Sequence, residues 1–115
     1  MTGKRSRRKG HDFERELVRL FREAMPGADV RRGLQYRDGA ECGDVTAGPL
    51  HIEAKCGKKP PLRPALDQAE RTAPSWATPL AVCKSDRDEP IVVIRLDEFV
   101  GIVRSWWAAT TEEET

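Results

Sequence analysis

Apolar residues recur at helical spacing in three separate stretches of this chain. His11–Met25 carries an apolar row on one side and ends at a Pro-Gly pair, which stops a helix. Leu62–Ala73 and Leu96–Trp107 carry two further apolar stripes. Trp106 and Trp107 are hard to bury fully in so small a domain, so two interpretations are open for them: a partner interface or simple core packing.

Shorter apolar runs between these helices have the length and composition of strands. The runs are Ala28–Leu34, Val45–Ala47, Leu50–Ala54, Pro79–Lys84 and Ile91–Arg95. The order α-β-β-β-α-β-β-α predicts an α/β (α+β) fold with a central mixed sheet flanked by helices. At 115 residues the chain has the size of one domain. We expect residues 1–9 to form a flexible basic arm, residues 10–107 a single domain, and residues 108–115 an acidic disordered tail.

Gly48 and Pro49 separate two of these runs and predict a tight hairpin. Gly can take the first central position of a type II′ turn, and the fixed φ of Pro suits the second. Asp44 then faces Glu53 across the hairpin, on the side opposite to its apolar residues, and Lys55 lies on the same side. Two like charges so placed destabilise a sheet and call for a compensating cation. A shift of one residue in register would undo this pairing.

Glu14 is the one acid of the first helix that falls inside the apolar arc, between Phe21 and Val18. Buried carboxylates are rare unless they are paired or bind a metal. Two interpretations are open: Glu14 points at the sheet and joins Asp44 and Glu53, or it forms a salt bridge at the edge of the stripe. In the first case three carboxylates meet, and Mg²⁺ prefers carboxylate oxygens.

Charge is unevenly distributed, although the formal net charge is only +1. Residues 1–37 hold eleven Lys and Arg against five Asp and Glu, a net +6, whereas residues 38–115 hold nine against fourteen, a net −5. A polyanion is therefore an expected partner of the first third, the alternative being an ordinary solvated surface. Arg15, Arg19 and Arg22 form an outward row that could follow a phosphate backbone.

Basic residues outside the predicted helices and strands add to this candidate surface. Arg8 and Lys9 belong to the basic arm, for which targeting and solubility are alternative roles. Arg37 lies in a polar loop that leads directly to Asp44, so it is expected near any substrate held there. Lys58 and Lys59 lie in a basic linker after the hairpin.

Several other functions are disfavoured by what the chain lacks. Cys42, Cys56 and Cys83 form no CxxC or Cys/His pattern, which fits a reducing compartment better than a disulfide framework or a zinc site. No apolar run approaches about 18 residues, and no apolar segment follows the basic N-terminus. We therefore expect no membrane span, no secretory signal and a cytoplasmic location.

The set formed by Glu14, Asp44, Glu53 and Lys55 suits metal-assisted hydrolysis of a phosphodiester. One or two Mg²⁺ ions can polarise the phosphate, lower the pKa of a bound water and stabilise the leaving oxygen. Lys55 could position or deprotonate that water, or neutralise charge on the phosphate, and the sequence leaves these roles open. Gln68 borders the stripe of the second helix, where its amide either reaches this site or the nucleic acid, or is an ordinary surface group.

Two motifs resemble those of a known nuclease family. Asp44 followed by Glu53-Ala54-Lys55 is similar to the PD-(D/E)xK signature. Arg8-Lys9-Gly10, with Glu14-Arg15-Glu16-Leu17 after it, resembles the opening RKG-x-x-x-EREL of archaeal-type Holliday-junction resolvases, which also occur in viruses. The resemblance covers roughly residues 8–58. It implies metal ligation by Glu14, Asp44 and Glu53, a catalytic role for Lys55, and DNA binding by Arg15, Arg31 and Arg32.

The resemblance further implies a restriction-endonuclease-like fold, a homodimer, dependence on Mg²⁺ with Mn²⁺ as a substitute, and paired symmetric nicks in four-way DNA. It also implies an intracellular protein, including one of viral origin that acts in a host cell. Gly43 stands where the signature has Pro, and the spacing from Asp44 to Glu53 is short. Two alternatives remain open: a restriction-like or repair DNA endonuclease with the same site, and a non-catalytic DNA-binding module.

Overall fold

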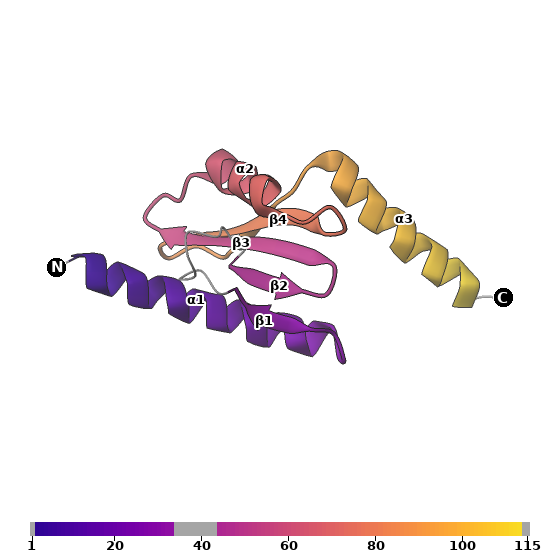
Figure 1. The fold of residues 1–115 in the computed structure, drawn as a ribbon, viewed down its shortest axis with the longest axis horizontal. Helices are drawn as coiled ribbons and strands as arrows, with labels where there is room; N and C mark the ends of the chain where they lie inside the picture. Colours follow the sequence, from indigo (N-terminus) through magenta and orange to yellow (C-terminus); the bar gives the residue numbers. More distant parts are fainter. Residues whose placement is uncertain (1, 34–43, 114–115) are drawn as a thin grey trace.

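The computed structural model of this chain describes residues 2–33 and 44–113. The elements in these ranges follow one another in the order α-β-β-β-α-β-β-α (Figure 1). They are α1 (Thr2–Ala24), β1 (Val30–Arg32), β2 (Val45–Ala47), β3 (Leu50–Gly57), α2 (Leu62–Thr72), β4 (Thr78–Ser85), β5 (Ile91–Val93) and α3 (Leu96–Glu113). The fold is therefore α/β, with a mixed sheet flanked by helices, as the sequence predicts.

The sheet has five strands in the order β1-β2-β3-β4-β5. Strands β3 and β4 are parallel, and the other neighbouring pairs are antiparallel. Helix α2 lies in the connection between the two parallel strands, because a parallel pair needs a crossover. Helix α1 packs against β1, β2 and β3, and α2 packs against β3 and β4.

The two helices cover opposite faces of the sheet, as alternation along β4 shows. Leu80 and Val82 belong to the larger core cluster, on the face covered by α1. Ala81 and Cys83 point to the other face and pack with Ala65 of α2. Small side chains on this second face let α2 approach closely, so most of the buried apolar volume lies under α1. The buried members of the larger cluster are Phe13, Leu17, Val18, Val30, Val45, Ala47, Ile52, Leu80 and Val82.

The hairpin between β2 and β3 forms in the register that the Gly-Pro turn predicts. Ala47 faces Leu50 and Val45 faces Ile52. Gly48 has a φ of +55°, the left-handed region that the first central position of a type II′ turn requires. A Cβ built on Gly48 would also lie 2.9 Å from the Met25 Cε atom of the chain segment after α1. Turn geometry therefore favours glycine at this position, whereas the contact with the flexible end of Met25 could be relieved by a shift of that side chain.

Both terminal helices are longer than the sequence predicts. Helix α1 begins at Thr2 instead of His11, so residues 2–9, expected as a flexible basic arm, continue the helix. Lys and Arg are good helix formers, and the one Gly of this stretch costs only about 1 kcal/mol, which does not end a helix. Lys9 also forms an ion pair with Asp86. Helix α3 runs to Glu113, so residues 108–113 of the expected acidic disordered tail are helical as well.

Helix α3 differs from the other two in that it leaves the body of the molecule (Figure 1). It has no extensive contact with the described strands or with α1 and α2. The radius of gyration is 15.1 Å, above the roughly 13 Å of a compact domain of this length. No described helix is both long enough and apolar enough to cross a membrane.

Candidate active site

Asp44 lies directly before β2 and is held from two sides by the backbone of the sheet. Its side-chain oxygen Oδ2 accepts a hydrogen bond of 2.7 Å from the backbone N–H of Ala54 on β3. Its carbonyl oxygen accepts a second bond, of 2.9 Å, from the N–H of Gly33 after β1. Only 5% of Asp44 is exposed. The hairpin register therefore brings this carboxylate onto β3, beside Glu53.

Glu53 is the most buried charged residue of this site, with 1% of its surface exposed. The charge of Asp44 acts on it from the neighbouring strand, and the Nζ atom of Lys55 lies 3.8 Å from its Oε2. Its other oxygen, Oε1, is buried and has no hydrogen-bond partner in the part of the chain that the structure describes. A buried carboxylate oxygen without a partner is costly, so this position calls for a proton or a cation.

The two facing carboxyl groups hold their protons more tightly than free ones do. Burial raises the pKa of Glu53 to about 8, and the negative charge of Asp44 adds to this effect, whereas Lys55 opposes it. Burial also raises the pKa of Asp44, against the hydrogen bond from Ala54. Two carboxylates that share a site do not ionise independently, so the pair keeps a proton near neutral pH unless a cation replaces it.

Glu14 reaches the same region from α1, with 8% of its surface exposed. Burial and the charge of Asp44 raise its pKa, and Arg32 of β1 opposes this shift. The Arg32 Nε and Nη2 atoms lie 3.0 and 2.9 Å from its Oε1. Both interpretations of Glu14 thus hold in part, because it is buried beside the acidic pair and also forms a salt bridge. The charge of Asp44 and, to a smaller extent, that of Glu14 disfavour ionisation of Glu53, although alternation along the sheet directs Glu53, like its neighbour Ala81, to the face covered by α2.

Metal binding was tested against the donor atoms present. Within residues 2–33 and 44–113 no three His, Cys, Asp or Glu side chains are arranged as a ready metal site. Glu14 is turned toward Arg32, which leaves Asp44 and Glu53 as a two-carboxylate pair. That pair fits a hard divalent cation in its chemistry, since it offers carboxylate oxygens, one of them buried and unpaired.

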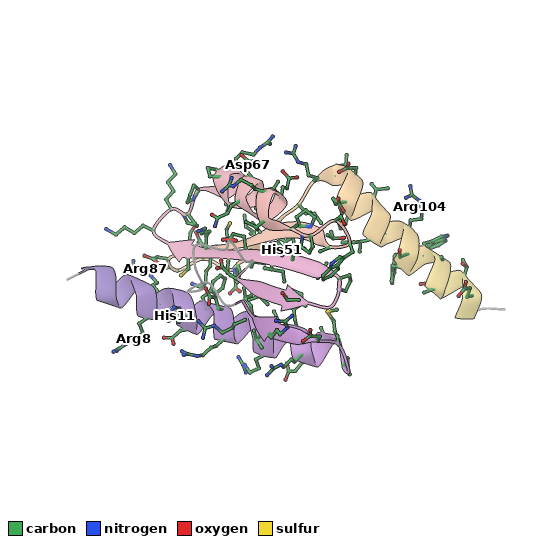
Figure 2. All side chains as sticks on the ribbon, viewed as in Figure 1. Arg8, His11, His51, Asp67, Arg87 and Arg104 are labelled. Atoms are coloured by element: carbon green, nitrogen blue, oxygen red, sulfur yellow. The ribbon has the colours of Figure 1, made fainter. Side chains whose placement is uncertain are left out.

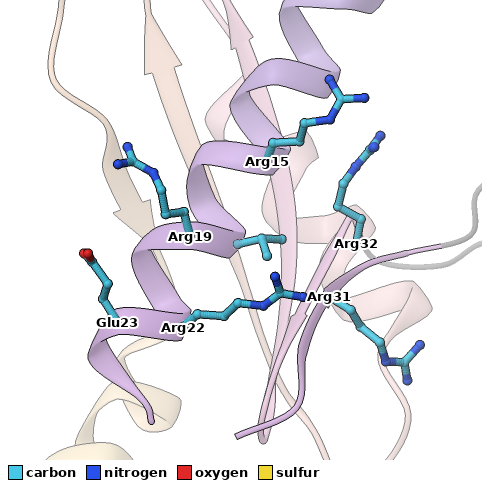
Figure 3. A pocket seen from close by; sticks show the side chains of 7 residues that line it. Arg15, Arg19, Arg22, Glu23, Arg31 and Arg32 are labelled. Atoms are coloured by element: carbon cyan, nitrogen blue, oxygen red, sulfur yellow. The ribbon is translucent and has the colours of Figure 1, made fainter. Parts of the chain in front are cut away.

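A basic groove lies next to this acidic site, between α1 and β1. It has a volume of about 570 Å³, and we call it the arginine groove. Figure 3 shows its arginine side chains, which come from both elements. Arg22 reaches across it and donates a 3.0 Å hydrogen bond to the carbonyl of Val30. Arg32 also pairs with Glu14, which links the groove to the acids. The lining residues are Arg15, Val18, Arg19, Arg22, Glu23, Arg31 and Arg32.

The other predicted contact residues do not line this groove. Arg8 is exposed near the start of α1, and Lys9 pairs with Asp86. Lys58 and Lys59 are exposed after β3. Gln68 of α2 is half-buried, and Arg37 lies outside the described residues. Of the nine predicted DNA contacts, Arg15, Arg31 and Arg32 are brought together.

His51 is a buried residue of β3 for which no role was predicted from the sequence (Figure 2). Its Nε2 atom lies 2.8 Å from the Thr72 Oγ1 of α2. Thr72 in turn donates to the carbonyl of Gln68 at 2.9 Å. This chain of contacts ties α2 to the strand that carries Glu53. Burial lowers the pKa of His51, which keeps the ring neutral for this contact. Alternation along the strand could have indicated His51, since it places this ring on the face of Glu53.

Comparison with protein-family models, curated proteins and solved structures finds no match for this chain. The function must therefore be argued from the geometry of the site itself.

Proposed function

We propose that this chain is a metal-dependent, structure-specific DNA endonuclease that resolves four-way junctions by paired symmetric nicks. The observation that carries the proposal is the buried pair of carboxyl groups of Asp44 and Glu53 beside Lys55. Binding alone needs no facing carboxylates, which are costly in a sheet. We also propose that the mixed sheet, with its acid-bearing hairpin, is a variant of the restriction-endonuclease-like fold.

Asp44 and Glu53 would hold Mg²⁺, or Mn²⁺ in its place, and Glu14 would complete the set when it is released from Arg32. The bound ion supplies Lewis acidity toward the phosphate and its attacking water. The Ala54 N–H fixes the orientation of Asp44, and the sheet fixes Glu53, so the acids need little rearrangement. Lys55 places a positive charge at the side of the pair, where it can neutralise a phosphate oxygen or orient water.

The arginine groove supports DNA as the substrate. Five arginines line this groove, and arginine pairs with phosphate in a bidentate way. Arg15 and Arg31 also pair with Asp12 and Asp29, so a phosphate would have to replace these carboxylates. Because Arg32 of the groove pairs with Glu14, a strand bound in the groove would lie near this acid. Binding should therefore weaken steeply with salt, as counterions are released from the DNA.

Paired nicks need two sites, and each chain carries one pair formed by Asp44 and Glu53. We therefore propose that the active form is a homodimer that acts on intracellular DNA. Each copy would cut one of two opposite strands of a four-way junction.

The test compares a synthetic four-way junction with linear duplex of matching sequence, in Mg²⁺ and in Mn²⁺. We expect symmetric nicks in the junction and little cutting of the duplex. Asp44→Asn should abolish cleavage but retain binding without metal, because it removes one ligand charge. Asp67→Asn on the exposed face of α2 is the matched control and should cut normally.

Other results would redirect the proposal. Equal cutting of both substrates would favour a restriction-like or repair endonuclease with the same site. Binding without cutting in either metal would identify a DNA-binding module. Cleavage by Asp44→Asn at the wild-type rate would show that the site is wrongly assigned.

A further inference from the structure

Helix α3 exposes the largest set of apolar side chains in the described part of the chain. Trp106 and Trp107 are 63% and 60% exposed, and their rings meet edge to face with centroids 6.2 Å apart. Figure 2 shows Arg104 projecting from the same helix, well away from the sheet. The exposed large apolar residues of α3 are Leu96, Phe99, Val100, Ile102, Val103, Trp106 and Trp107.

These residues follow the spacing by which one helix packs against another. Leu96, Phe99, Val103, Trp106 and Thr110 repeat at alternating intervals of three and four, the a and d positions of a heptad. We call this row the α3 seam. Three large apolar residues flank it, namely Val100, Ile102 and Trp107. Within residues 96–112 the charged residues lie off the seam, and those are Asp97, Glu98, Arg104 and Glu112.

The start of α3 is fixed in a direction that carries the seam away from its own sheet. Arg95, directly before the helix, donates two hydrogen bonds to Glu70 of α2, at 2.7 and 2.9 Å. Its carbonyl accepts the first helical bond of this region, from the N–H of Phe99 at 3.0 Å. An isolated helix of this length is only marginally stable in water. We therefore expect α3 to pack against a surface that the described part of its own chain does not supply.

We propose that α3 pairs along the α3 seam with the α3 of a second copy of this chain, as a two-fold symmetric dimer. Every copy carries the same uncovered seam, so one self-complementary contact covers both at once. The exposed fractions correspond to on the order of 700 Å² of apolar side chain per helix. Complete burial of these side chains on both helices would remove at most roughly 1,400 Å² from water, an upper bound that falls within the range of about 1,200–2,000 Å² for stable interfaces.

The inference supplies the contact surface for the dimer that the proposed function requires, but its test uses neither DNA nor metal. A failure here would leave the cleavage test standing, and a failure of cleavage would leave the dimer standing. The two hypotheses are therefore separable by experiment.

The experiment measures molar mass by light scattering over a dilution series. The wild-type chain should run at twice 12.9 kDa. The double variant Val103→Glu, Trp106→Glu places two charges in the seam and should be a monomer, with affinity reduced by about 100-fold or more. Ser105→Glu adds a charge to the same helix outside the seam, and this control should remain a dimer.

Tryptophan fluorescence gives a second measurement that does not depend on how well a variant folds. Dilution of the wild-type chain should shift the emission to the red, because Trp106 and Trp107 become exposed to solvent when the dimer dissociates. Trp106→Phe, Trp107→Phe leaves Trp76 alone, which is 68% exposed outside α3, and should remove the shift. A wild-type chain that stays monomeric at the highest concentration, or a seam variant that stays dimeric, would overturn the proposal. The monomeric result would assign α3 to a partner of different sequence.

Discussion

Helices α1 and α3 carry the same kind of apolar row, yet only α1 packs it against its own sheet. Phe13 of α1 is 5% exposed, whereas Phe99 of α3 is 49% exposed. Helix α1 lies over β1, β2 and β3, but α3 follows an edge strand and is directed outward by the bonds between Arg95 and Glu70. Helical periodicity thus identifies a face that needs a partner and does not identify the partner.

The largest expected effect is a difference between matched substitutions in the two helices. Phe13→Ala removes a ring from the main core and should lower the free energy of unfolding by about 3–5 kcal/mol. Phe99→Ala should barely change the stability of a dissociated monomer, but it should weaken the dimer. Urea unfolding at low and high protein concentration measures both effects. Equal losses at low concentration would mean that α3 packs on its own body.

The acidic pair of Asp44 and Glu53 should make stability depend on pH, while the α3 seam should not. The raised pKa of Glu53, about 8 against an ordinary 4.5, means that the folded state binds its proton more tightly. The stability from this group is full below about pH 4.5 and is lost as pH rises through 8. We expect the melting temperature of the metal-free protein to fall by several degrees between pH 5 and pH 8.

Variants at the same site check this assignment. Glu53→Gln should flatten the dependence and raise the melting temperature at the alkaline end, whereas Asp67→Asn should leave the slope unchanged. Added Mg²⁺ should restore stability at pH 8 in the wild-type chain and in Asp67→Asn, but not in Glu53→Gln. The molar mass should stay constant over the same range, because no ionisable side chain lies on the α3 seam.

A smaller effect is expected on DNA binding, and it should distinguish the arginines of α1 from Arg104 of α3. Arg19→Ala or Arg22→Ala removes one guanidinium from the arginine groove and should weaken DNA binding several-fold. Each should also reduce the salt slope by about one unit, since one phosphate contact is lost. Arg104→Ala removes the same group from α3 and should change neither quantity. Fluorescence anisotropy at several salt concentrations measures both, and an equal loss for Arg104→Ala would mean that general charge drives binding.

The smallest expected effect comes from Gly10 of α1 and Gly101 of α3. Neither Gly10 nor Gly101 would place a new Cβ within 4 Å of another atom. Alanine should therefore add about 1 kcal/mol of helix stability at either position. Gly10→Ala should raise the melting temperature at every concentration, whereas Gly101→Ala should mainly tighten the dimer. Thermal melts at two concentrations distinguish these results.

The site was predictable where local chain geometry determines it. The Gly48-Pro49 turn sets the register of the hairpin, and that register brings Asp44 to Glu53 without any knowledge of the remaining fold. Burial of Glu14 also followed from its place in the apolar arc. Its bond to Arg32 did not, because this strand arginine is 18 residues away and meets α1 only through tertiary packing.

The fold was predictable at the level of element order and less so at the helix ends. Lys and Arg before His11 suggested an arm, but the same residues are good helix formers, and Lys9 pairs with Asp86. Exposure of α3 was not predictable, because a core helix and an interface helix share one pattern. Trp106 and Trp107 had suggested both possibilities, and the structure places them outside the core.

The hairpin has a consequence for the order in which the molecule folds. Strands β2 and β3 are joined by two residues, and hairpins of this kind close within about 1–10 μs. The parallel pairing of β3 with β4 must wait for the α2 crossover, which is a slower, long-range step. Asp44 and Glu53 therefore meet early, and their mutual repulsion enters the kinetic barrier. Mild acidity should accordingly speed refolding as well as favour the final state.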